Sequence, residues 1–164
     1  MNYISVEKDN PIHYELLTKL MIEYVAETDQ HNSATTPKSV ILKITGSMID
    51  KLDQNRILRI VSYDGEPVGF CYAKVDKEGD KGLIRPNWGY IMEFYVCPSY
   101  RKRGVGREMV NQCEKFFVSQ GANAVWLTAD AVTGIPFWLA CDYRDSNEVS
   151  PENNQKIFVK QLNC

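Results

Sequence analysis

The sequence has few residues that bind metals or take part in redox chemistry. It contains two histidines and five cysteines in 164 residues, and no cysteine pair has the Cys-x-x-Cys spacing. His13 and His31 stand far apart, outside any ligand spacing, so we expect no metal site and a surface position for both. The cysteines are odd in number, and three lie in apolar, strand-like or helix-like contexts. We therefore expect free buried thiols and a reducing, cytoplasmic location.

Long apolar runs and an excess of one charge are also missing. No window approaches the length of a membrane span, and residues 1–6 lack the basic start and apolar run of a signal peptide. The formal net charge of −2 gives no electrostatic reason to expect a nucleic-acid partner. We expect a soluble cytoplasmic protein with no membrane and no nucleic-acid partner. A homodimer stays open, because no residue identifies an interface.

The composition and the length are typical of one folded domain. Hydrophobic residues make up 44% of the chain, which is enough for a single core. No repeat, low-complexity tract or linker interrupts the sequence. We expect one domain over residues 1–164.

Local signals predict two helices near the N-terminus. Asn10-Pro11 is a cap followed by proline at the first helical position, and apolar residues continue at helical spacing to residue 25. We expect residues 26–36 to be irregular. Thr36-Pro37 repeats the cap signature and opens a second helix to about residue 53, interrupted near Gly46-Ser47.

The rest of the chain alternates between strands and helices. Asp64-Gly65 is a turn between two strands of an antiparallel hairpin. The whole predicted order is β-α-α-β-β-β-α-β-α-β-β. The expected strands cover residues 2–7, 57–63, 67–75, 88–96, 124–128, 142–144 and 156–162, and the later helices cover 105–121 and 133–140.

The most informative stretch is 90–106, an apolar strand with a proline stop, a basic run and a Gly-x-Gly turn that opens a helix. Backbone N–H groups at a helix start lack partners, and the helix dipole adds partial positive charge there. Basic side chains supply further donors, and glycines let a phosphate approach the main chain. The stretch therefore predicts a pyrophosphate site. The basic residues and glycines are Arg101, Lys102, Arg103, Gly104 and Gly106.

Two better-known phosphate loops are excluded. A dinucleotide fingerprint needs a glycine where Met109 stands, and a P-loop needs Gly-Lys-Ser/Thr where Gly106-Arg107-Glu108 stands. A solvated turn that binds nothing stays open as the structural alternative, because short motifs occur by chance.

The pattern Arg-x-x-Gly-x-Gly, after a Glu-containing strand that ends in Val-x-Pro, resembles motif A of the GNAT superfamily of acyl-CoA-dependent N-acyltransferases. The matching residues are Val96, Pro98, Arg101, Gly104 and Gly106. The resemblance implies an α/β (α+β) GNAT fold, with a mixed central sheet of about six to seven strands flanked by about four helices. It also implies that strands four and five are parallel and splayed apart.

The resemblance implies acetyl-CoA as the co-substrate. In the family the motif loop grips the pyrophosphate, which here assigns Arg101, Lys102, Arg103, Gly104, Val105, Gly106 and Arg107. The pantetheine arm pairs with strand four, here Phe94, Tyr95 and Val96, and one of their N–H groups polarises the thioester carbonyl. Trp138 either packs against the cofactor arm or belongs to the core.

The resemblance also places the proton chemistry. A carboxylate within an apolar strand is costly unless it is paired or faces water. Glu93 is therefore a general base for the amine, directly or through water, or a residue that orients the amine; the structural alternative is a glutamate at a bulge, paired with a nearby Arg or Lys. The tyrosine that usually protonates the departing thiolate aligns with Trp138, whose indole cannot do this. If no side chain protonates the departing thiolate, the reaction forfeits only about 2 kcal/mol of protonation free energy at pH 7. Tyr143, Tyr95 or water stays open as the substitute donor.

The acceptor is less well marked. The resemblance places its pocket near residues 26–36 and 144–155. Carboxylates there and on the first helix either attract a cationic amine or are solvated loop residues. They are Glu23, Glu27, Asp29, Glu148 and Glu152.

The function we expect is N-acetyltransfer to a primary amine of a small molecule or peptide, directly within a ternary complex. The alternative is a catalytically weak acyl-CoA-binding sensor or interaction domain. It is motivated by Trp138 and Ala131, which replace the family's usual tyrosine and asparagine.

Overall fold

The computed structural model describes residues 1–163 of the chain. Its elements follow the predicted order, with a short 3-10 helix, η1, added after β4. They are β1 (Asn2–Ser5), α1 (Pro11–Asn32), α2 (Lys38–Asp50), β2 (Arg56–Tyr63), β3 (Glu66–Val75), β4 (Gly89–Val96), η1 (Pro98–Tyr100), α3 (Val105–Ser119), β5 (Ala124–Ala129), α4 (Gly134–Ala140), β6 (Arg144–Val149) and β7 (Lys156–Gln161).

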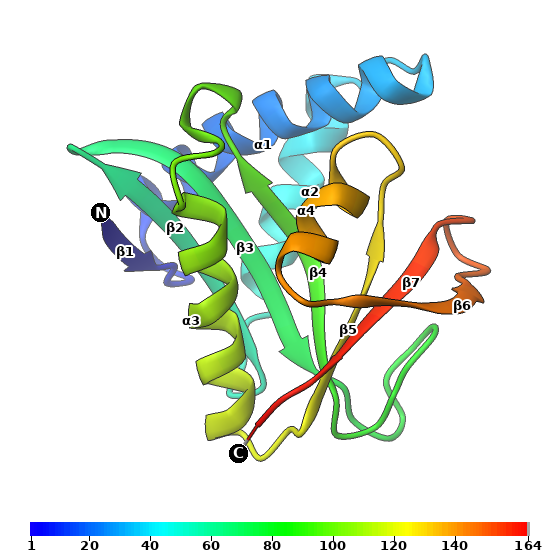
Figure 1. Ribbon diagram of the computed structural model, residues 1–164. Coiled ribbons are helices and arrows are strands. Elements are labelled where there is room, and N and C mark those ends of the chain that lie inside the picture. The colour runs from blue at the N-terminus through cyan, green and yellow to red at the C-terminus, as the bar shows by residue number, and fades with distance from the viewer. Residues whose placement is uncertain (164) are drawn as a thin grey trace. The chain divides into compact units, whose positions relative to one another are not determined.

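Seven strands form one mixed sheet in the order β1-β2-β3-β4-β5-β7-β6 (Figure 1). β4 and β5 are parallel, with Gly89 opposite Val125 and Tyr90 opposite Trp126. α3 lies between them in the chain and makes the crossover that a parallel pair requires. The other registered pairs, β1 with β2, β5 with β7 and β6 with β7, are antiparallel. The predicted mixed sheet with a parallel fourth and fifth strand is confirmed.

The chain forms two compact units, each made of two segments. The first contains Met1–Tyr72 and Glu93–Gly106, and the second contains Ala73–Met92 and the chain from Arg107 on. β3 and β4 each contribute to both units. The expectation of a single domain over residues 1–164 stays a prediction.

In the first unit, α1 packs against α2, and β1 pairs with β2 (Figure 1). The predicted start of α1 is confirmed: the Asn10 side chain accepts hydrogen bonds from the backbone N–H groups of Ile12 and His13, and Pro11 opens the helix. The predicted hairpin turn is confirmed too. Asp64 and Gly65 have φ values of 50° and 86°, the left-handed pair that joins two strands tightly.

The prediction that the chain is irregular from residue 26 is wrong, because α1 continues to Asn32 and ends at Ser33 with φ 52°. The Asp29 carboxylate accepts hydrogen bonds from the backbone N–H of Thr36 at 2.6 Å and from its hydroxyl at 2.8 Å. Thr36 therefore closes the end of α1 and does not cap α2, whose N-cap position is Pro37. The hydrogen bonds to Asp29 therefore decide the position of Thr36, although the Thr36-Pro37 pair predicted an N-cap there.

The predicted interruption of the second helix is also wrong, since α2 runs from Lys38 to Asp50 through Gly46-Ser47. A glycine within a helix costs only about 1 kcal/mol, which the buried face of α2 outweighs. The predicted loop at 144–155 is partly a strand, because β6 covers Arg144–Val149 with a register shift. The strand expected at 142–144 therefore lies further along the chain, because the polar sequence of β6 does not mark its bounds.

In the second unit, the buried face of α3 includes Met109, Val110, Cys113 and Phe117, as predicted, and Gly89 of β4 lies under the Phe117 ring. The Asp76 carboxylate organises the connection from β3 to β4. It accepts hydrogen bonds from the Trp126 indole at 2.7 Å and the Arg85 backbone at 2.9 Å, and Lys74 Nζ lies 3.1 Å away. Both Asp76 and Lys74 are buried, so the connection carries a buried ion pair.

Cys71, Cys97, Cys113 and Cys141 are buried free thiols, as expected, whereas Cys164 lies outside the described residues. Among residues 1–163, no helix is long and apolar enough to cross a membrane.

Candidate active site

The predicted site residues fall into the two units. Glu93, Phe94–Val96 and the loop Arg101–Gly106 belong to the first unit, where α1 also lies. Arg107, Trp138 and Tyr143 belong to the second unit. The structure therefore brings together the predicted base, the end of β4 and the glycine loop.

The loop between η1 and α3 has the backbone shape of an anion cradle. Lys102 has φ 60° and Gly104 has φ 82°, and α3 begins at the next residue, Val105. Alternating left-handed and right-handed residues turn successive N–H groups toward one side, which makes a concavity for an anion. Nothing lies within 4 Å of the position where a Cβ on Gly104 would stand. The exposed side chains of Lys102 and Arg103 add positive charge, so the loop fits a pyrophosphate.

The Arg101 side chain has a different position from its neighbours. Its Nε donates to the backbone oxygen of Val96 at 2.8 Å, and Nη2 donates to Glu27 Oε2 on α1 at 2.6 Å. The guanidinium also lies over the Tyr95 ring, 5.8 Å from its centroid. Arg101 thus ties the loop to the end of β4 and to α1.

Glu93 lies half-buried on β4 and bonds to a residue of α1. The Tyr24 hydroxyl donates to Glu93 Oε2 at 2.6 Å. Burial raises the pKa of Glu93, and the hydrogen bond from Tyr24 partly offsets this by lowering it. Among the described residues no ion pair includes Glu93, so the alternative of a structural ion pair gains no support.

The Cys97 thiol, which directly follows β4, is poorly suited to nucleophilic catalysis. Cys97 Sγ is 3.3 Å from Glu23 Oε2. Burial, together with the hydrogen bond to Glu23, raises the pKa of Cys97 to about 11. The reactive form of cysteine is the thiolate, so at neutral pH this side chain stays a protonated donor to Glu23. Burial also raises the pKa of Tyr95, whose side chain packs against Tyr24.

Three of the predicted acceptor carboxylates have structural partners outside the site. Asp29 closes the end of α1, as described above. Glu148 pairs with Arg85 at 2.5 Å, and Glu152 accepts from the backbone N–H of Leu83 at 3.1 Å. Glu23 and Glu27, which lie on α1 in the same unit as Glu93, are the two remaining candidates.

Trp138 and Tyr143 are buried in the second unit. Their rings meet edge to face with centroids 5.1 Å apart, and the Tyr143 hydroxyl donates to Glu114 Oε1 at 3.1 Å. Burial is the main reason that the pKa of Tyr143 is raised. Arg107 donates to the backbone oxygen of Ala140. These contacts favour packing roles for Trp138 and Tyr143.

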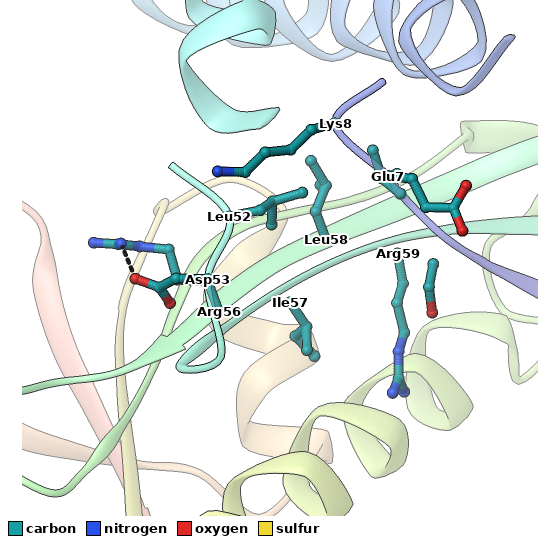
Figure 2. Close-up of a pocket in the computed structure, with 10 residues that line it drawn as sticks. Glu7, Lys8, Leu52, Asp53, Arg56, Ile57, Leu58 and Arg59 are labelled. Carbon is teal, nitrogen blue, oxygen red and sulfur yellow. Dashed lines mark hydrogen bonds and ion pairs between the residues drawn. The ribbon is translucent and has the colours of Figure 1, made fainter. Parts of the chain in front are cut away.

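A pocket of about 380 Å³ lies elsewhere in the first unit, between the residues that follow β1 and the start of β2 (Figure 2). Lys8, Leu52 and Arg59 line it, and Arg56 pairs with Asp53 at its rim. None of its ten lining residues belongs to the predicted cofactor or catalytic set. We therefore place no chemistry there.

A model of the acetyltransferase (GNAT) family matches residues 17–143, a span that includes Glu93 and the glycine loop. The chain belongs to the GNAT acetyltransferase family. No curated protein matches the sequence.

Solved structures confirm the GNAT fold. An aminoglycoside 6'-N-acetyltransferase complexed with coenzyme A is 17% identical, with a TM-score of 0.73 over 100% of this chain and 98% of that one. An aminoglycoside 6'-acetyltransferase type Ii is 19% identical, with a TM-score of 0.74 over 100% and 99%. The PaiA N-acetyltransferase of Thermoplasma acidophilum, in complex with coenzyme A, is 14% identical, with a TM-score of 0.70 over 99% and 100%. At these identities the likeness shows the fold alone.

Sequence reasoning did not find Tyr24. It lies 69 residues from Glu93, and the helical pattern marks it only as one apolar position of the first helix. The available signal was weak: a tyrosine on a buried helix face usually needs a partner for its hydroxyl.

Within residues 1–163 no group of three or more His, Cys, Asp or Glu residues could hold a metal ion.

Proposed function

We propose that the protein transfers an acetyl group from acetyl-CoA to a primary amine, directly within a ternary complex. The observation that carries this proposal is the loop at 101–106, where two left-handed residues lead into the start of α3 in a chain of the GNAT family. A built anion cradle next to a carboxylate-bearing strand is what such a reaction requires.

The loop would hold the pyrophosphate of the co-substrate. Backbone N–H groups of residues 102–106 supply donors, and Lys102 and Arg103 supply charge, while Arg101 anchors the loop through Val96 and Glu27. Phe94–Val96 would accompany the pantetheine arm along β4. When bound, acetyl-CoA supplies the thioester whose acyl group is transferred.

Glu93 would take the proton from the incoming amine. An alkylammonium with a pKa of about 10.4 costs about 4–5 kcal/mol to deprotonate at pH 7. A carboxylate with a raised pKa is a stronger base than a solvated one, and burial provides this for Glu93. The protonated state of Cys97 supports direct transfer over a covalent acyl-cysteine route.

We assign no side chain to protonation of the departing thiolate. Tyr143 is buried against Glu114, and a coenzyme A thiol that leaves as thiolate at pH 7 forfeits only about 2 kcal/mol. Water is sufficient for this step. Trp138 would then serve the core of the second unit.

The acceptor we propose is a cationic amine of a small molecule or peptide. Glu23 on α1 accepts from the neutral Cys97 thiol and keeps its negative charge, whereas the charge of Glu27 is paired with Arg101. Two neighbours in fold are named aminoglycoside acetyltransferases. The cytoplasmic location and a homodimer stay predictions.

Calorimetric titration with acetyl-CoA tests the proposal, with dephospho-coenzyme A and a non-nucleotide thioester as controls. We expect a dissociation constant near 10 μM, about −7 kcal/mol, and weaker binding of both controls. A panel of spermidine, kanamycin and a lysine-containing peptide then tests turnover, with Glu93→Gln as the impaired variant. Failure to bind acetyl-CoA would remove the proposal. Binding without turnover of any amine would favour the acyl-CoA sensor.

A further inference from the structure

We infer that Tyr24 is a positioning residue for Glu93: its hydroxyl, 2.6 Å from Oε2, holds the carboxylate in place. This inference rests on the proposed function of Glu93 as the base. It goes further because it assigns a role to a residue of α1 that none of the loop and strand residues supplies.

The geometry of the contact is that of a strong hydrogen bond. Tyr24 reaches from α1 to β4, and its hydroxyl lies 2.6 Å from Glu93 Oε2. Hydrogen bonds between a hydroxyl and a carboxylate fall in this range when the acceptor is charged. Since Tyr24 donates to Oε2, we assign Oε1 as the atom that accepts the proton of the alkylammonium. The alkylammonium thereby becomes the neutral amine that attacks the thioester.

The ring of Tyr24 packs against two other aromatic rings, which also contact each other. It meets Phe70 edge to face at a centroid distance of 5.7 Å, and Tyr95 in a tilted arrangement at 5.5 Å. Such aromatic contacts restrict rotation of the ring. The hydroxyl therefore points at Glu93 before any substrate arrives, and the carboxylate needs no reorganisation when it accepts a proton.

The bond also decides how useful the carboxylate is near neutral pH. Burial favours the protonated acid, which cannot accept a proton from the amine, whereas the donated hydrogen bond favours the carboxylate. Without Tyr24, Glu93 would be protonated up to a higher pH. Tyr24 thus keeps a half-buried carboxylate in its working form.

Three other titratable side chains of the first unit bear on the charge around Glu93: Tyr72, Glu23 and Glu27. Tyr72 on β3 is a second buried phenol whose pKa is raised, by burial foremost, with a smaller contribution from the charge of Glu93. Glu23 and Glu27 on α1 bond to Cys97 and Arg101.

Tyr72 is the matched control for Tyr24 in the experiment below. It feels the charge of Glu93 and carries the same functional group, while the hydroxyl that bonds the Glu93 carboxylate is that of Tyr24.

The test is a pH titration of the Glu93 carboxyl carbon by NMR in protein labelled with [5-13C]glutamate. The Glu93 resonance is assigned from its loss in Glu93→Gln. We expect Tyr24→Phe, which keeps the ring, to move the titration midpoint up by about one pH unit, because a hydrogen bond to the charged form is lost. Tyr72→Phe should leave the midpoint within a few tenths of a pH unit. An unchanged midpoint in Tyr24→Phe, or an equal shift in Tyr72→Phe, would overturn the inference.

Kinetics separate this inference from the proposed function. With any amine of the panel that turns over, Tyr24→Phe should move the acid limb of kcat/KM upward by the same amount and leave acetyl-CoA affinity unchanged. In a Glu93→Gln background, Tyr24→Phe should have no further effect. If no amine turns over but the NMR midpoint moves, the proposed function fails and the role of Tyr24 in the ionisation of Glu93 stands.

Discussion

The ion pair between Arg101 and Glu27 can be tested by removing its two charges one at a time and together. Arg101→Met keeps much of the side-chain length and loses the guanidinium, and Glu27→Gln keeps the shape and loses the charge. The first removes the 2.6 Å bond to Glu27 and the 2.8 Å bond to the Val96 oxygen, whereas the second weakens only the former. We therefore expect Arg101→Met to be the more destabilising change.

The magnitude follows from the exposure of the two side chains, which is 32% for Arg101 and 20% for Glu27. Exposed pairs contribute about 0.2–1 kcal/mol, and breaking a fully buried pair costs about 3–5 kcal/mol. We expect a coupling of about 1–2 kcal/mol for this partly solvated pair. The further loss of the bond to Val96 adds about 1 kcal/mol to Arg101→Met.

The assay is urea denaturation of the four proteins of the double-mutant cycle, repeated at high salt. The double variant should be more stable than the sum of the single changes predicts, by the coupling energy. High salt should reduce that energy in part, because the pair is partly exposed. Calorimetric titration with acetyl-CoA then measures binding. Arg101→Met should weaken it about tenfold, because the loop loses its bonds to Val96 and Glu27.

Glu27→Gln separates two roles of Arg101. If Arg101 anchors the loop, releasing its guanidinium should leave acetyl-CoA affinity unchanged or lower it. A gain in affinity would show that Glu27 competes with the pyrophosphate for Arg101, and a coupling below about 0.3 kcal/mol would show that the pair is not an anchor. Either result would refute the reasoning from this geometry.

Three other substitutions test the backbone and the core. Gly104→Ala meets no steric contact but imposes φ 82° on an L-residue, so it should cost about 1–2 kcal/mol in urea denaturation and weaken acetyl-CoA binding. Gly89→Ala would place a Cβ 2.5 Å from the Phe117 ring and should cost about 1–3 kcal/mol, part of which Phe117→Leu should restore. Asp76→Asn leaves the buried Lys74 charge without its full counter-charge and should cost about 3 kcal/mol, which Lys74→Met in the same chain should reduce. Equal stability of the single and double variants would contradict the last two predictions.

Much of the fold could be predicted from the sequence because its signals are local. Asn10-Pro11 caps and opens α1, and Asp64-Gly65 adopts the left-handed pair of a tight hairpin turn. Each depends on the conformational preferences of two adjacent residues and on backbone N–H groups within the same turn. The loop at 101–106 was predictable for the same reason.

Other boundaries depended on contacts that no local signal contains. The capping signature at Thr36-Pro37 indicated a helix start, but Asp29 takes both the N–H and the hydroxyl of Thr36. The strand expected at 142–144 was placed too early, because the polar side chains of β6 lack the apolar alternation of a half-buried strand. In both places a partner outside the local window decided the structure.

The candidate site divides in the same way. The sequence by itself indicated the family, which is confirmed, and it proposed the glycine loop and Glu93 as site residues, since these depend on residue types at fixed spacing along one segment. Only the tertiary structure decided what each side chain touches: Tyr24 against Glu93, Glu27 against Arg101, and Tyr143 inside the core of the second unit. Backbone conformation follows from neighbours in the chain, whereas burial, pKa and hydrogen-bond partners follow from segments that meet only when helices pack on the sheet.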